Sequence, residues 1–429
     1  MSFRSSEGYR DLGTGWIGQL PAHWQTRRLR TLVQIKKRIA GVEGPDVLSI
    51  TQRGIKVRDT ESNDGQLAES YAHYQRVEVG DFAMNHMDLL TGWVDVSERA
   101  GVTSPDYRVF SLRSGAPADR RYLLRTLQNA YSQRVFYAFG QGASHLGRWR
   151  LPTDAFQDFE VPLPPLDEQR RIAAFLDTET AKIDELVDEQ RRLVELLKEK
   201  RQAVISHAVT KGLNPSVPMK DSGVEWLGQV PAHWQVAALK RFVTSLDGMR
   251  IPLSAEERGQ RTGAYPYYGA SGAIDFIDGF LFSEDLILVS EDGANLVNRS
   301  TPIAFVARGK YWVNNHAHVL RPCDKHLDFW AECIEVIDLA PFVTGAAQPK
   351  LTAEALGGLV VAVPPTHEER RAIAAAISSA REKYQPLIME AETAVSLLIE
   401  RRAALISAAV TGKIDVREPA AALAELEPA

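Results

Sequence analysis

Three strings of residues occur twice in this chain, in the same order. A tag of ten positions comes first, a proline-led string second and the string Ile-Ser-x-Ala-Val-Thr third. The tag is Asp11, Gly13, Trp16, Gly18, Gln19, Pro21, Ala22, His23, Trp24 and Gln25, and it returns 210 residues later as Asp221, Gly223, Trp226, Gly228, Gln229, Pro231, Ala232, His233, Trp234 and Gln235. The second string is Pro164-Pro165-x-x-Glu168-x-Arg170-Arg171, which returns from Pro364 to Arg371, and the third begins at Ile205 and again at Ile406. A period near 200 residues is too long for a solenoid, so the repeat indicates two tandem copies of a whole module. Two similar modules on one chain suit a target that has two parts.

Bulk composition limits the class of protein. The 429 residues can form two or three domains, and 45% apolar with 24% charged residues is ordinary for a soluble globular chain. No run of about 18 apolar residues suggests a membrane span, and the first ten residues lack the apolar core of a signal peptide. Only Cys323 and Cys333 are present, which gives no disulfide framework and predicts a cytoplasmic protein.

Net charge differs between the two halves. Residues 1–163 carry 21 basic and 18 acidic residues, a net of +3, whereas residues 214–363 carry 12 and 17, a net of −5. A chain with a total of −5 does not resemble a protein that coats DNA without specificity. Any contact with DNA therefore requires local basic patches or a basic partner.

Two long helices are the clearest secondary-structure prediction. The stretch from Thr178 to Val209 contains no Gly or Pro, and its length of about 30 residues corresponds to about 45 Å. Narrow apolar stripes require a partner helix, and the simplest partner for each long helix is the other one. Pro386 falls early in the second helix, where a first turn would tolerate it, whereas an earlier helix start would make it a kink. Gly212 and Gly412 are expected to end the helices. The predicted contact residues are Ile183, Leu186, Leu193, Leu197 and Val204 in the first helix and Leu387, Ala391, Ala394, Leu398 and Leu405 in the second.

The segments between the tags and the helices are predicted to be mixed α/β. Short apolar runs at Val47–Ile50, Leu286–Ser290 and Leu359–Val363 are typical of strands. The two α/β blocks share little sequence outside their flanks, so the flanks look duplicated and the central parts do not. The predicted boundaries are a tag at 1–25, an α/β block at 26–163, a helical block at 164–213, a second α/β block at 214–363 with its tag at 221–235, a second helical block at 364–415 and a flexible tail at 416–429.

The repeated aromatic tag could form a stacking platform or a structural corner, and Trp beside Pro favours packing. His23 and His233 recur with the tag, which also favours a shared packing role over catalysis. His316 and His318 hint at a metal, but no Cys pair or His-Glu-x-x-His helix accompanies them, so no metal site is predicted. No cofactor loop, methyltransferase tetrad or nuclease carboxylate cluster is present, and the sequence supports no catalytic constellation.

Polar stretches punctuated by glycine occupy similar places in the two α/β blocks. Asn, Gln, Arg, Ser and Thr side chains recognise base edges, while Lys and backbone N–H groups hold phosphates. These stretches are therefore either DNA-contacting loops or turns around an unrelated core. The candidate DNA contacts are Arg53, Lys56, Arg58, Asn85, His86, Ser104, Tyr107, Gln141, Ser144, His145 and Arg148 in the first block and Tyr267, Tyr268, Ser271, Asp292, Asn295, Asn314, His316, Gln348 and Lys350 in the second.

Taken together, these strings resemble the specificity subunits of type I restriction–modification systems over nearly the whole chain. The resemblance rests on the order and duplication of the tag, the proline-led helix starts and the helix ends. It also rests on Tyr265-Pro266-Tyr267-Tyr268-Gly269-Ala270-Ser271-Gly272 and Ser290-Glu291-Asp292-Gly293-Ala294-Asn295-Leu296 in the second block, and on Gly80 to Asp88 and Thr103 to Tyr107 in the first. One departure is Thr366-His367-Glu368-Glu369, which replaces Leu-Asp-Glu-Gln at 166–169.

The resemblance implies a fold and a role. The expected fold is α/β (α+β), with two globular target-recognition domains separated by two long antiparallel helices that form a coiled-coil spacer with pseudo-two-fold symmetry. Each domain would recognise one half of a split double-stranded DNA site, and the helices would dock two methyltransferase subunits. Restriction, or motor, subunits would join them. The chain itself would be non-catalytic, because S-adenosylmethionine, ATP and magnesium belong to the partners.

Two other interpretations remain open. A single-chain modification or restriction enzyme would need a cofactor loop or metal-binding carboxylates. The other is a scaffold or adaptor without catalysis of its own, either in another DNA-targeting system or holding two ligand-binding domains that never touch DNA. The acidic second block favours a scaffold that never touches DNA, and DNA affinity that falls steeply with salt would exclude that scaffold.

Overall fold

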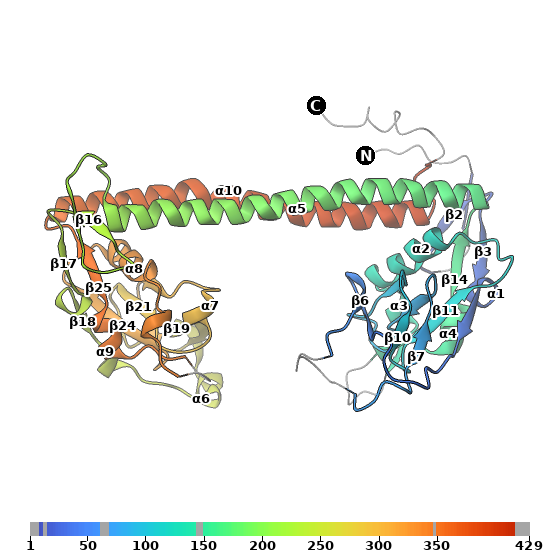
Figure 1. Cartoon of the computed structure of the whole chain (residues 1–429), viewed down its shortest axis with the longest axis horizontal. Helices are drawn as coiled ribbons and strands as arrows, with labels where there is room; N and C mark the ends of the chain where they lie inside the picture. Colours follow the sequence, from blue (N-terminus) through green and yellow to red (C-terminus); the bar gives the residue numbers. More distant parts are fainter. Residues whose placement is uncertain (1–7, 12–14, 61–67, 143–148, 346–348, 417–429) are drawn as a thin grey trace. The chain divides into compact units, whose positions relative to one another are not determined.

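The computed structural model describes residues 8–11, 15–60, 68–142, 149–345 and 349–416. It divides into two compact units, of which one comprises Met1–Gln190 with Thr393–Ala429 and the other Arg191–Glu392. Each unit combines one α/β block with half of each long helix (Figure 1). Within the described ranges, no helix is long and apolar enough to cross a membrane. The tail expected at 416–429 lies outside the described residues except for Val416.

A four-stranded antiparallel sheet in the order β4-β11-β8-β9 forms the centre of the first unit. Stacked Phe82 and Phe110 and the apolar face of helix α2 form its core. Asp119 begins α2, because its side chain accepts hydrogen bonds from the backbone N–H groups of Arg121 and Tyr122. The remaining elements are peripheral hairpins and short helices. The block contains α1 (Leu29–Leu32), β4 (Val33–Lys36), β5 (Leu48–Thr51), β6 (Gly54–Val57), β7 (Gln75–Val77), β8 (Phe82–Met84), β9 (Val94–Val96), β10 (Gly101–Thr103), β11 (Arg108–Leu112), α2 (Arg120–Ser132), α3 (Val135–Ala138), β12 (Gln141–Gly142), β13 (Trp149–Arg150) and α4 (Thr153–Asp158).

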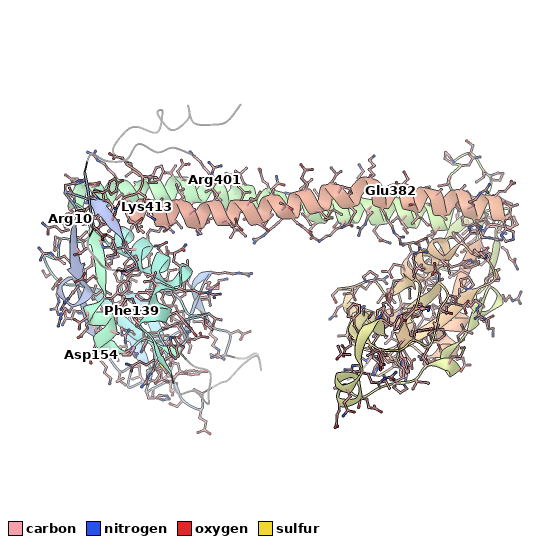
Figure 2. The ribbon with its side chains drawn as sticks, turned by 180° about the vertical axis from the view of Figure 1, so that it is seen from behind. Arg10, Phe139, Asp154, Glu382, Arg401 and Lys413 are labelled. Atoms are coloured by element: carbon pink, nitrogen blue, oxygen red, sulfur yellow. The ribbon has the colours of Figure 1, made fainter. Side chains whose placement is uncertain are left out.

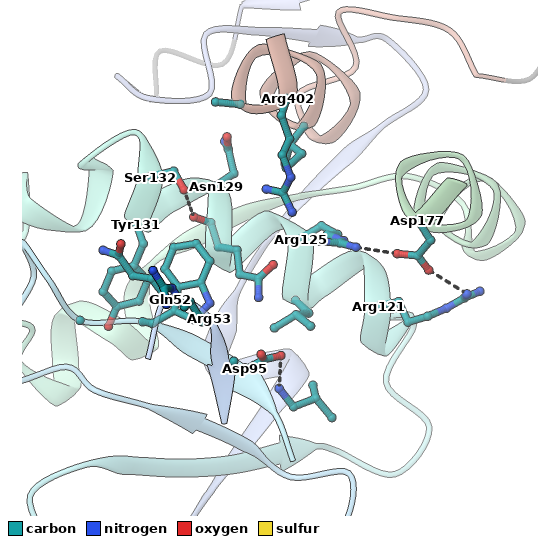
Figure 3. Close-up of a pocket in the computed structure, with 18 of the residues that line it drawn as sticks. Gln52, Arg53, Asp95, Arg121, Arg125, Asn129, Tyr131, Ser132, Asp177 and Arg402 are labelled. Atoms are coloured by element: carbon teal, nitrogen blue, oxygen red, sulfur yellow. Dashed lines mark hydrogen bonds and ion pairs between the residues drawn. The ribbon is translucent and has the colours of Figure 1, made fainter. Parts of the chain in front are cut away.

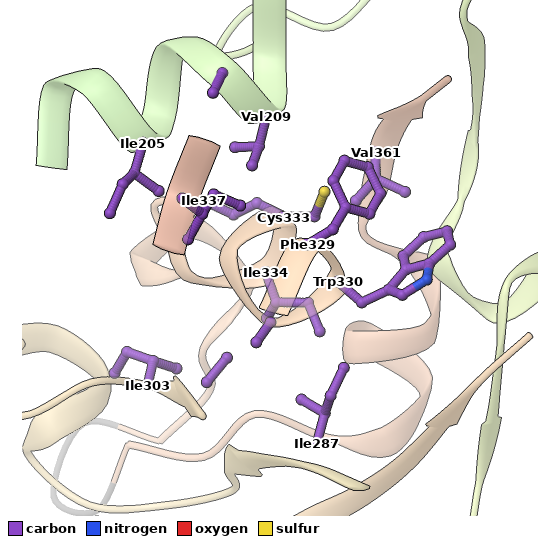
Figure 4. Packing of buried hydrophobic residues seen from close by; sticks show 14 of the residues in the cluster. Ile205, Val209, Ile287, Ile303, Phe329, Trp330, Cys333, Ile334, Ile337 and Val361 are labelled. Carbon is purple, nitrogen blue, oxygen red and sulfur yellow. The ribbon is translucent and has the colours of Figure 1, made fainter. Parts of the chain in front are cut away.

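The second unit has a central sheet of the same design, in the order β18-β24-β21-β22. Helix α8 covers it, and Figure 4 shows Phe329, Trp330 and Ile334 of this helix packed between the sheet residue Ile287 and Val209 of the long helix α5. The block contains η1 (Leu239–Arg241), β18 (Val243–Ser245), η2 (Asp247–Met249), α6 (Ala255–Gln260), β19 (Thr262–Gly269), β20 (Gly272–Ile277), β21 (Leu286–Ser290), α7 (Asn295–Asn298), β22 (Ala304–Ala307), β23 (Trp312–Val313), β24 (Ala317–Pro322), α8 (Leu327–Glu335), η3 (Ala340–Phe342) and α9 (Ala353–Gly358).

The prediction that only the flanks are duplicated is therefore wrong, because the central sheet is repeated as well. Strand β11 pairs with β4 and β8 as β24 pairs with β18 and β21. Sequence comparison missed this because apolar residues exchange freely in a buried strand when their volume is kept. What differs are the additions: the hairpin β5-β6 and the pair β7-β10 in the first unit, and the three-stranded sheet β20-β19-β23 in the second.

Each tag forms a buried corner beside the start of a long helix, as its Trp and Pro residues predicted. The indole of Trp24 is buried and its Nε1 donates to Glu168 at 3.0 Å, while Trp234 donates to Glu369 at 2.9 Å. His23 and His233 bind the same two carboxylates at 2.8 and 2.9 Å, which confirms a packing role. The tags and their neighbours comprise β1 (Tyr9–Asp11), β2 (Gln19–Pro21), β3 (Gln25–Arg28) and β14 (Glu160–Leu163), and β15 (Met219–Asp221), β16 (Gln229–Pro231), β17 (Gln235–Ala238) and β25 (Val360–Val363).

These contacts correct the register of the repeat at the helix starts. Aligning the Pro pairs makes Glu368 the counterpart of Glu168, but the residue that binds the tag in the second unit is Glu369. The helices therefore repeat with an offset of 201 from their first turn, the offset that the strings beginning at Ile205 and Ile406 also have. The extra residue lies between the Pro pair and the helix.

Both long helices are longer than predicted. Helix α5 (Leu166–Lys211) has 46 residues and α10 (His367–Val410) has 44, so each begins within three residues of its Pro pair. Pro386 consequently lies in the interior of α10 rather than in its first turn. It lacks the N–H that would bond the carbonyl of Glu382, and both residues are exposed, so water can satisfy that carbonyl. Gly212 and Gly412 follow the helices with φ of +78° and +69°, as expected of helix-ending glycines.

In each unit the N-terminal half of one long helix packs against the C-terminal half of the other, so the helices run antiparallel. Asp184 pairs with Arg402 at 2.8 Å in the first unit, and Arg201 donates to Gln385 at 2.6 Å in the second. The two contacts occupy equivalent positions of the repeat, because Asp184 corresponds to Gln385 and Arg201 to Arg402 at the offset of 201. Ile183 and Leu197 lie on the contact seam as predicted, and the seam also contains Val187, Val194, Ile377, Tyr384 and Ile388.

Candidate nucleic-acid interface

The two central sheets end in equivalent edges, and several of the predicted DNA contacts lie there. We define the first edge as the end of β8, the start of β11 and the segment at Leu151, and the second edge as the end of β21, the start of β24 and the segment at Leu351. Leu151 N–H donates to the carbonyl of His86 at 2.9 Å, and Leu351 N–H donates to that of Glu291 at 2.7 Å. The sheet registers make Asn85 equivalent to Ser290 and His86 equivalent to Glu291.

A buried basic residue lies behind each edge, at equivalent positions of the central strands. In the first unit Arg108 donates from Nη2 to the carbonyl of Leu151 at 3.2 Å and lies over the ring of Phe156. In the second, His318 lies with its Nε2 2.8 Å from the carbonyl of Leu351. Burial lowers the pKa of Arg108 to about 10, which still leaves the guanidinium charged at neutral pH. Neither residue was among the predicted site residues, because nothing in an isolated Arg or His indicates that it faces a particular carbonyl.

The first edge is polar and uncharged at its centre. Burial and the neighbouring charge of Arg108 lower the pKa of His86 to about 3, so its imidazole is neutral. Asn85 lies beside it, with its carbonyl bonded to the Tyr131 hydroxyl at 2.7 Å and its Oδ1 accepting from the Met87 N–H. Neutral Asn and His side chains are suited to hydrogen bonds with base edges.

The loop before β11 is held by a residue that the sequence did not single out. Gln75 is buried, and its Nε2 donates to the carbonyl oxygens of Ser104 at 3.0 Å and Tyr107 at 2.6 Å. Ser104 and Tyr107 are half-buried, and Gln141 is exposed on β12. Ser144, His145 and Arg148 lie outside the described residues.

Basic side chains of the first unit gather around a cleft rather than at the edge. A cleft of about 990 Å³ lies between the β5-β6 turn, α2 and α10, and six arginines and three acidic residues line it. Arg121 and Arg125 both pair with Asp177, at 3.0 and 2.8 Å (Figure 3). Arg53 lines the cleft and makes no ion pair within the described ranges. Lys56, on the same hairpin, is exposed, and Arg58 just after it is half-buried.

Contacts bring several predicted residues of the second unit together at its edge. Asp292 binds Nδ1 of His316 at 2.7 Å and lies opposite Lys350 in an antiparallel bridge. Asn314 Oδ1 accepts from the His316 N–H at 2.8 Å, and the Asn314 N–H donates to the Tyr268 carbonyl. This edge therefore presents a carboxylate, an imidazole and an ammonium group. Ser271 is exposed on the adjoining β19-β20 turn, and Gln348 lies outside the described residues.

Two predicted residues of the second unit are structural, so their assignment to DNA contact is wrong. Tyr267 is 0% exposed, and its hydroxyl accepts from the Leu253 N–H at 2.8 Å. Asn295 is buried and closes a loop by binding the N–H and carbonyl of Thr301 at 2.9 and 3.1 Å. Asn314 is also buried, whereas Tyr268 is half-buried against Phe305 and Tyr311.

One group of possible metal ligands occurs in the described part of the chain, and an arginine already binds it. Asp324, His326 and His367 place ligand atoms within 4.8 Å of one another. Arg370 Nε lies 2.8 Å from the Asp324 carboxylate, and its Nη2 lies 3.1 Å from Nδ1 of His367. Because the guanidinium already balances the carboxylate, the donor set does not suit a cation. His316 and His318 bind different carboxylates, Asp292 and Asp247.

The long helices expose leucines at positions that the repeat relates. Leu186 and Leu387 are each 43% exposed, and Leu196 and Leu397 are 52% and 59% exposed. Each pair is separated by 201 residues, and each unit carries one leucine of each pair, one on α5 and the other on α10. Figure 2 shows the side chains along both helices, with Glu382 and Arg401 labelled on α10. Among the other predicted docking residues, Leu193 and Val204 are exposed, Leu197, Ala394, Leu398 and Leu405 are half-buried, and Ile183 is buried.

These exposed leucines correct the predicted helix seam. Leu186, Leu193, Val204 and Leu387 were expected to contact the other long helix, but the antiparallel seam is one position away, at Val187, Val194, Ile205 and Ile388. Each of these leucines has a neighbouring apolar residue, such as Val187 beside Leu186, so the helix has two possible apolar stripes. Periodicity alone does not show which stripe faces the other long helix. The chain has enough apolar residues for both an internal seam and an outer face.

Comparison with known proteins gives a consistent result. The family model for the type I restriction modification DNA specificity domain matches residues 90–196 and 231–384. A putative type I restriction enzyme specificity subunit of Haemophilus influenzae is 34% identical over 149 residues, which is 34% of this chain and 35% of that protein. The putative type I restriction enzyme MjaX specificity subunit of Methanocaldococcus jannaschii is 20% identical over 94% of this chain and 96% of its own length.

A solved structure shares the fold. It comes from work on the complex assembly and conformational transition of the type I restriction–modification system. The TM-score is 0.65 at 15% sequence identity, and the match covers 91% of this chain and 98% of the solved one. The likeness therefore extends over both α/β blocks and both long helices.

Proposed function

Because this chain belongs to the type I restriction modification DNA specificity family, we propose that it recognises a bipartite DNA site, one half with each α/β block. Its role is DNA sequence recognition, and the two blocks are from here the first and second recognition domains. The observation that supports the division into halves is the repeated edge. The same two strand ends carry Asn85 and His86 in the first domain and Ser290 and Glu291 in the second. One scaffold with different side chains suits two different base sequences.

The outer face of the long helices is the proposed docking surface for two methyltransferase subunits. Exposed leucine at equivalent positions of both units is costly for an isolated chain, since each buried leucine is worth about 1.5–3 kcal/mol. A duplicated apolar face suits two copies of one partner better than a single one. Restriction subunits would join the assembled complex, and the host cytoplasm would be the site of action.

Catalysis and its cofactors are proposed to belong to the partners. S-adenosylmethionine would be bound by the methyltransferase subunits, and ATP with magnesium by the restriction subunits. At the second edge, Asp292 binds His316 and Asn314 accepts from the His316 N–H, so these side chains hold one another in place. A purified chain that transferred methyl groups to DNA without a partner would contradict this assignment.

Helix length is proposed to set the gap between the two half-sites. Removing seven residues from each long helix, at matched positions, shortens both by about 10 Å, which is close to three base pairs. The recognised gap should shrink accordingly in the altered protein. A complex that assembles and still methylates sites with the original gap would disprove this role of the helices.

The decisive experiment is to co-express the chain with the methyltransferase subunit encoded beside it and to map methylated adenines in the host genome by single-molecule sequencing. A split motif with a fixed gap, absent when the chain is omitted, is the expected result. A control in which the first recognition domain carries Gln141→Ala should keep the second half of the motif. Stable complexes that leave no new methylation would favour a scaffold without DNA recognition.

A further inference from the structure

Histidine 318 takes the place that an arginine has in the other recognition domain. Val109 pairs with Ala83 in the first central sheet, and Val319 pairs with Leu288 at the corresponding point of the second. The residues just before them, Arg108 and His318, are therefore equivalent. Both are buried, and each points a nitrogen at the carbonyl of the leucine that closes its edge. The structural task shared by the two positions is that of a buried cation.

The hydrogen bonds of His318 require both ring nitrogens to carry a proton. Nε2 lies 2.8 Å from the carbonyl oxygen of Leu351, which only accepts, so this nitrogen is an N–H donor. Nδ1 lies 2.7 Å from Oδ2 of Asp247. With an ionised carboxylate there, Nδ1 must also donate, and the ring is an imidazolium. The side chain is only 2% exposed, so water does not compete for either bond.

Charged groups face His318 from every segment packed around it. Asp247 comes from η2, Arg250 follows η2, Glu291 follows β21, and Lys350 precedes the closing leucine. Glu291 lies 3.7 Å from the ring, and it binds Arg250 at 2.5 Å and Lys350 at 3.1 Å. Two carboxylates thus face one arginine and one lysine, and the lysine is half-exposed. Burial disfavours the charged ring, but the bonds to Asp247 and Leu351 outweigh it and raise the pKa of His318 above its ordinary value.

The imidazolium joins β24 to η2 and to the Leu351 segment of the second edge. Asp247 also accepts from the Val319 N–H at 2.8 Å, which ties η2 to β24. The Glu291 N–H donates to the His316 carbonyl at 2.9 Å, and Leu351 N–H donates to the Glu291 carbonyl. Loss of one proton from His318 would therefore remove a bond either to η2 or to the Leu351 segment. Lys350 lies on the Leu351 segment and is bridged to Asp292, and Asp292 in turn binds His316. Loosening the Leu351 segment would therefore disturb all three side chains.

We propose that His318 is a positioning residue of the second recognition domain, which in its charged form holds Asp292, His316 and Lys350 in place for DNA. The proposal rests on the proposed function for the DNA contact itself. Recognition of the second half-site then weakens as His318 loses its proton. The first half-site keeps its strength, because Arg108 remains charged and His86 remains neutral over the same pH range.

The direction of the pH dependence follows from the raised pKa of His318. A group whose pKa is higher in the folded state contributes fully below its ordinary pKa, about 6.5 for histidine. Its contribution is lost as the pH rises through the folded value. The second half-site should therefore bind best at neutral or slightly acidic pH and less well under alkaline conditions.

Protonation can be tested on the full chain without DNA. Nitrogen-15 labelling of histidine distinguishes an imidazolium from either neutral tautomer by chemical shift, and His318→Gln assigns the resonance. Both nitrogens of His318 should be protonated at pH 7, and the ring should titrate above the ordinary histidine value of about 6.5. A neutral ring at pH 7 would overturn the proposal, whatever the chain does with DNA.

The positioning role can be tested on the complex with its methyltransferase subunits. Once the motif is known, binding is measured from pH 6.5 to 9 on DNA with both half-sites intact and on DNA with either one scrambled. The loss of affinity on scrambling the second half should shrink about tenfold between pH 7 and pH 9, and the loss on scrambling the first should change less than about twofold.

Two variants separate His318 from other titrating groups. His318→Arg copies the first domain and should make recognition of the second half-site independent of pH, while His318→Gln should weaken it at every pH. Persisting pH dependence in His318→Arg would assign the effect to His316 and refute the proposal. If that variant fails to fold, a flat wild-type profile still refutes it. Absence of any sequence preference in the wild-type complex would instead contradict the proposed function.

Discussion

The two recognition domains carry the same central sheet but place different chemistry at its edge. In the first, neutral His86 lies in front of Arg108, whose charge does not depend on pH near neutrality. In the second, Glu291 lies in front of His318, within a network that also contains Asp247, Arg250 and Lys350. Both arrangements hold the same closing leucine by its carbonyl. The comparison shows that the two sheets keep the same backbone hydrogen bonds at the edge. The side chains in front of these bonds differ, which would allow the two domains to recognise different bases.

The long helices also carry equivalent features in the two units, namely the exposed leucines. Changing these leucines should have the largest effect on the binding of methyltransferase subunits. Leu397→Asp in the first unit and Leu196→Asp in the second each place a charge on one docking face. Loss of a buried leucine costs about 2 kcal/mol, or about 30-fold in affinity, and a buried aspartate costs more. Each variant should form a complex with one methyltransferase subunit, and the double variant with none.

Native mass spectrometry counts the subunits, and Leu196→Met serves as a control that keeps the apolar face. If either single variant lost both partners, or if both variants kept two, the faces would not be independent docking sites. Unfolding curves of the isolated variants should match the wild type, since both leucines are more than half exposed.

The two recognition domains should recognise separate half-sites, and removing one polar side chain from each domain tests this. Gln141→Ala should relax the first half of the methylated motif, and Asp292→Ala the second half, each by about 10- to 100-fold for the affected bases. Asp292→Ala also removes the partner of His316 at 2.7 Å, so Asp292→Asn is the milder companion variant. Genome-wide methylation maps give both halves in one measurement. Relaxation of the first half by Asp292→Ala would mean that the domains do not act independently.

The corrected register at the helix starts gives a prediction for stability. Glu369 accepts from the buried indole N–H of Trp234, whereas the neighbouring Glu368 is exposed. Glu369→Ala should lower the free energy of unfolding by about 1–3 kcal/mol, because it leaves that N–H unpaired. Glu368→Ala should change it by less than about 0.5 kcal/mol. Urea unfolding measures both, and the reverse order would restore the alignment by the Pro pairs.

Sequence reasoning predicted what repeated strings and strong periodicity encode. The tag corner, the two long helices, the glycine ends at Gly212 and Gly412 and the α/β character of the blocks follow from local patterns. It missed the repeated central sheet, since Phe82 and Ile287 fill equivalent places with different side chains. It also missed Arg108 and His318, because their role depends on a carbonyl more than thirty residues away. At the edges, glycine-rich strings identified the right loops but could not separate Tyr267, which packs inward, from Asp292, which binds His316 at the second edge.

The smallest expected effect concerns how salt acts on the two domains. Arg53 lines a cleft with three more arginines than acidic residues, and it makes no ion pair within the described part of the chain. If it contacts a phosphate, Arg53→Ala should reduce the slope of log affinity against log salt by about 1. Arg308, in the more acidic second domain, already pairs with Asp285 and Asp328 at 3.1 Å each, so Arg308→Ala should leave the slope unchanged. Titrations of the assembled complex between 50 and 200 mM salt, roughly the range in which phosphate contacts dominate, measure both slopes. Equal slopes for Arg53→Ala and wild type would remove the β5-β6 hairpin from the interface, and the basic character of the first domain would then need another explanation.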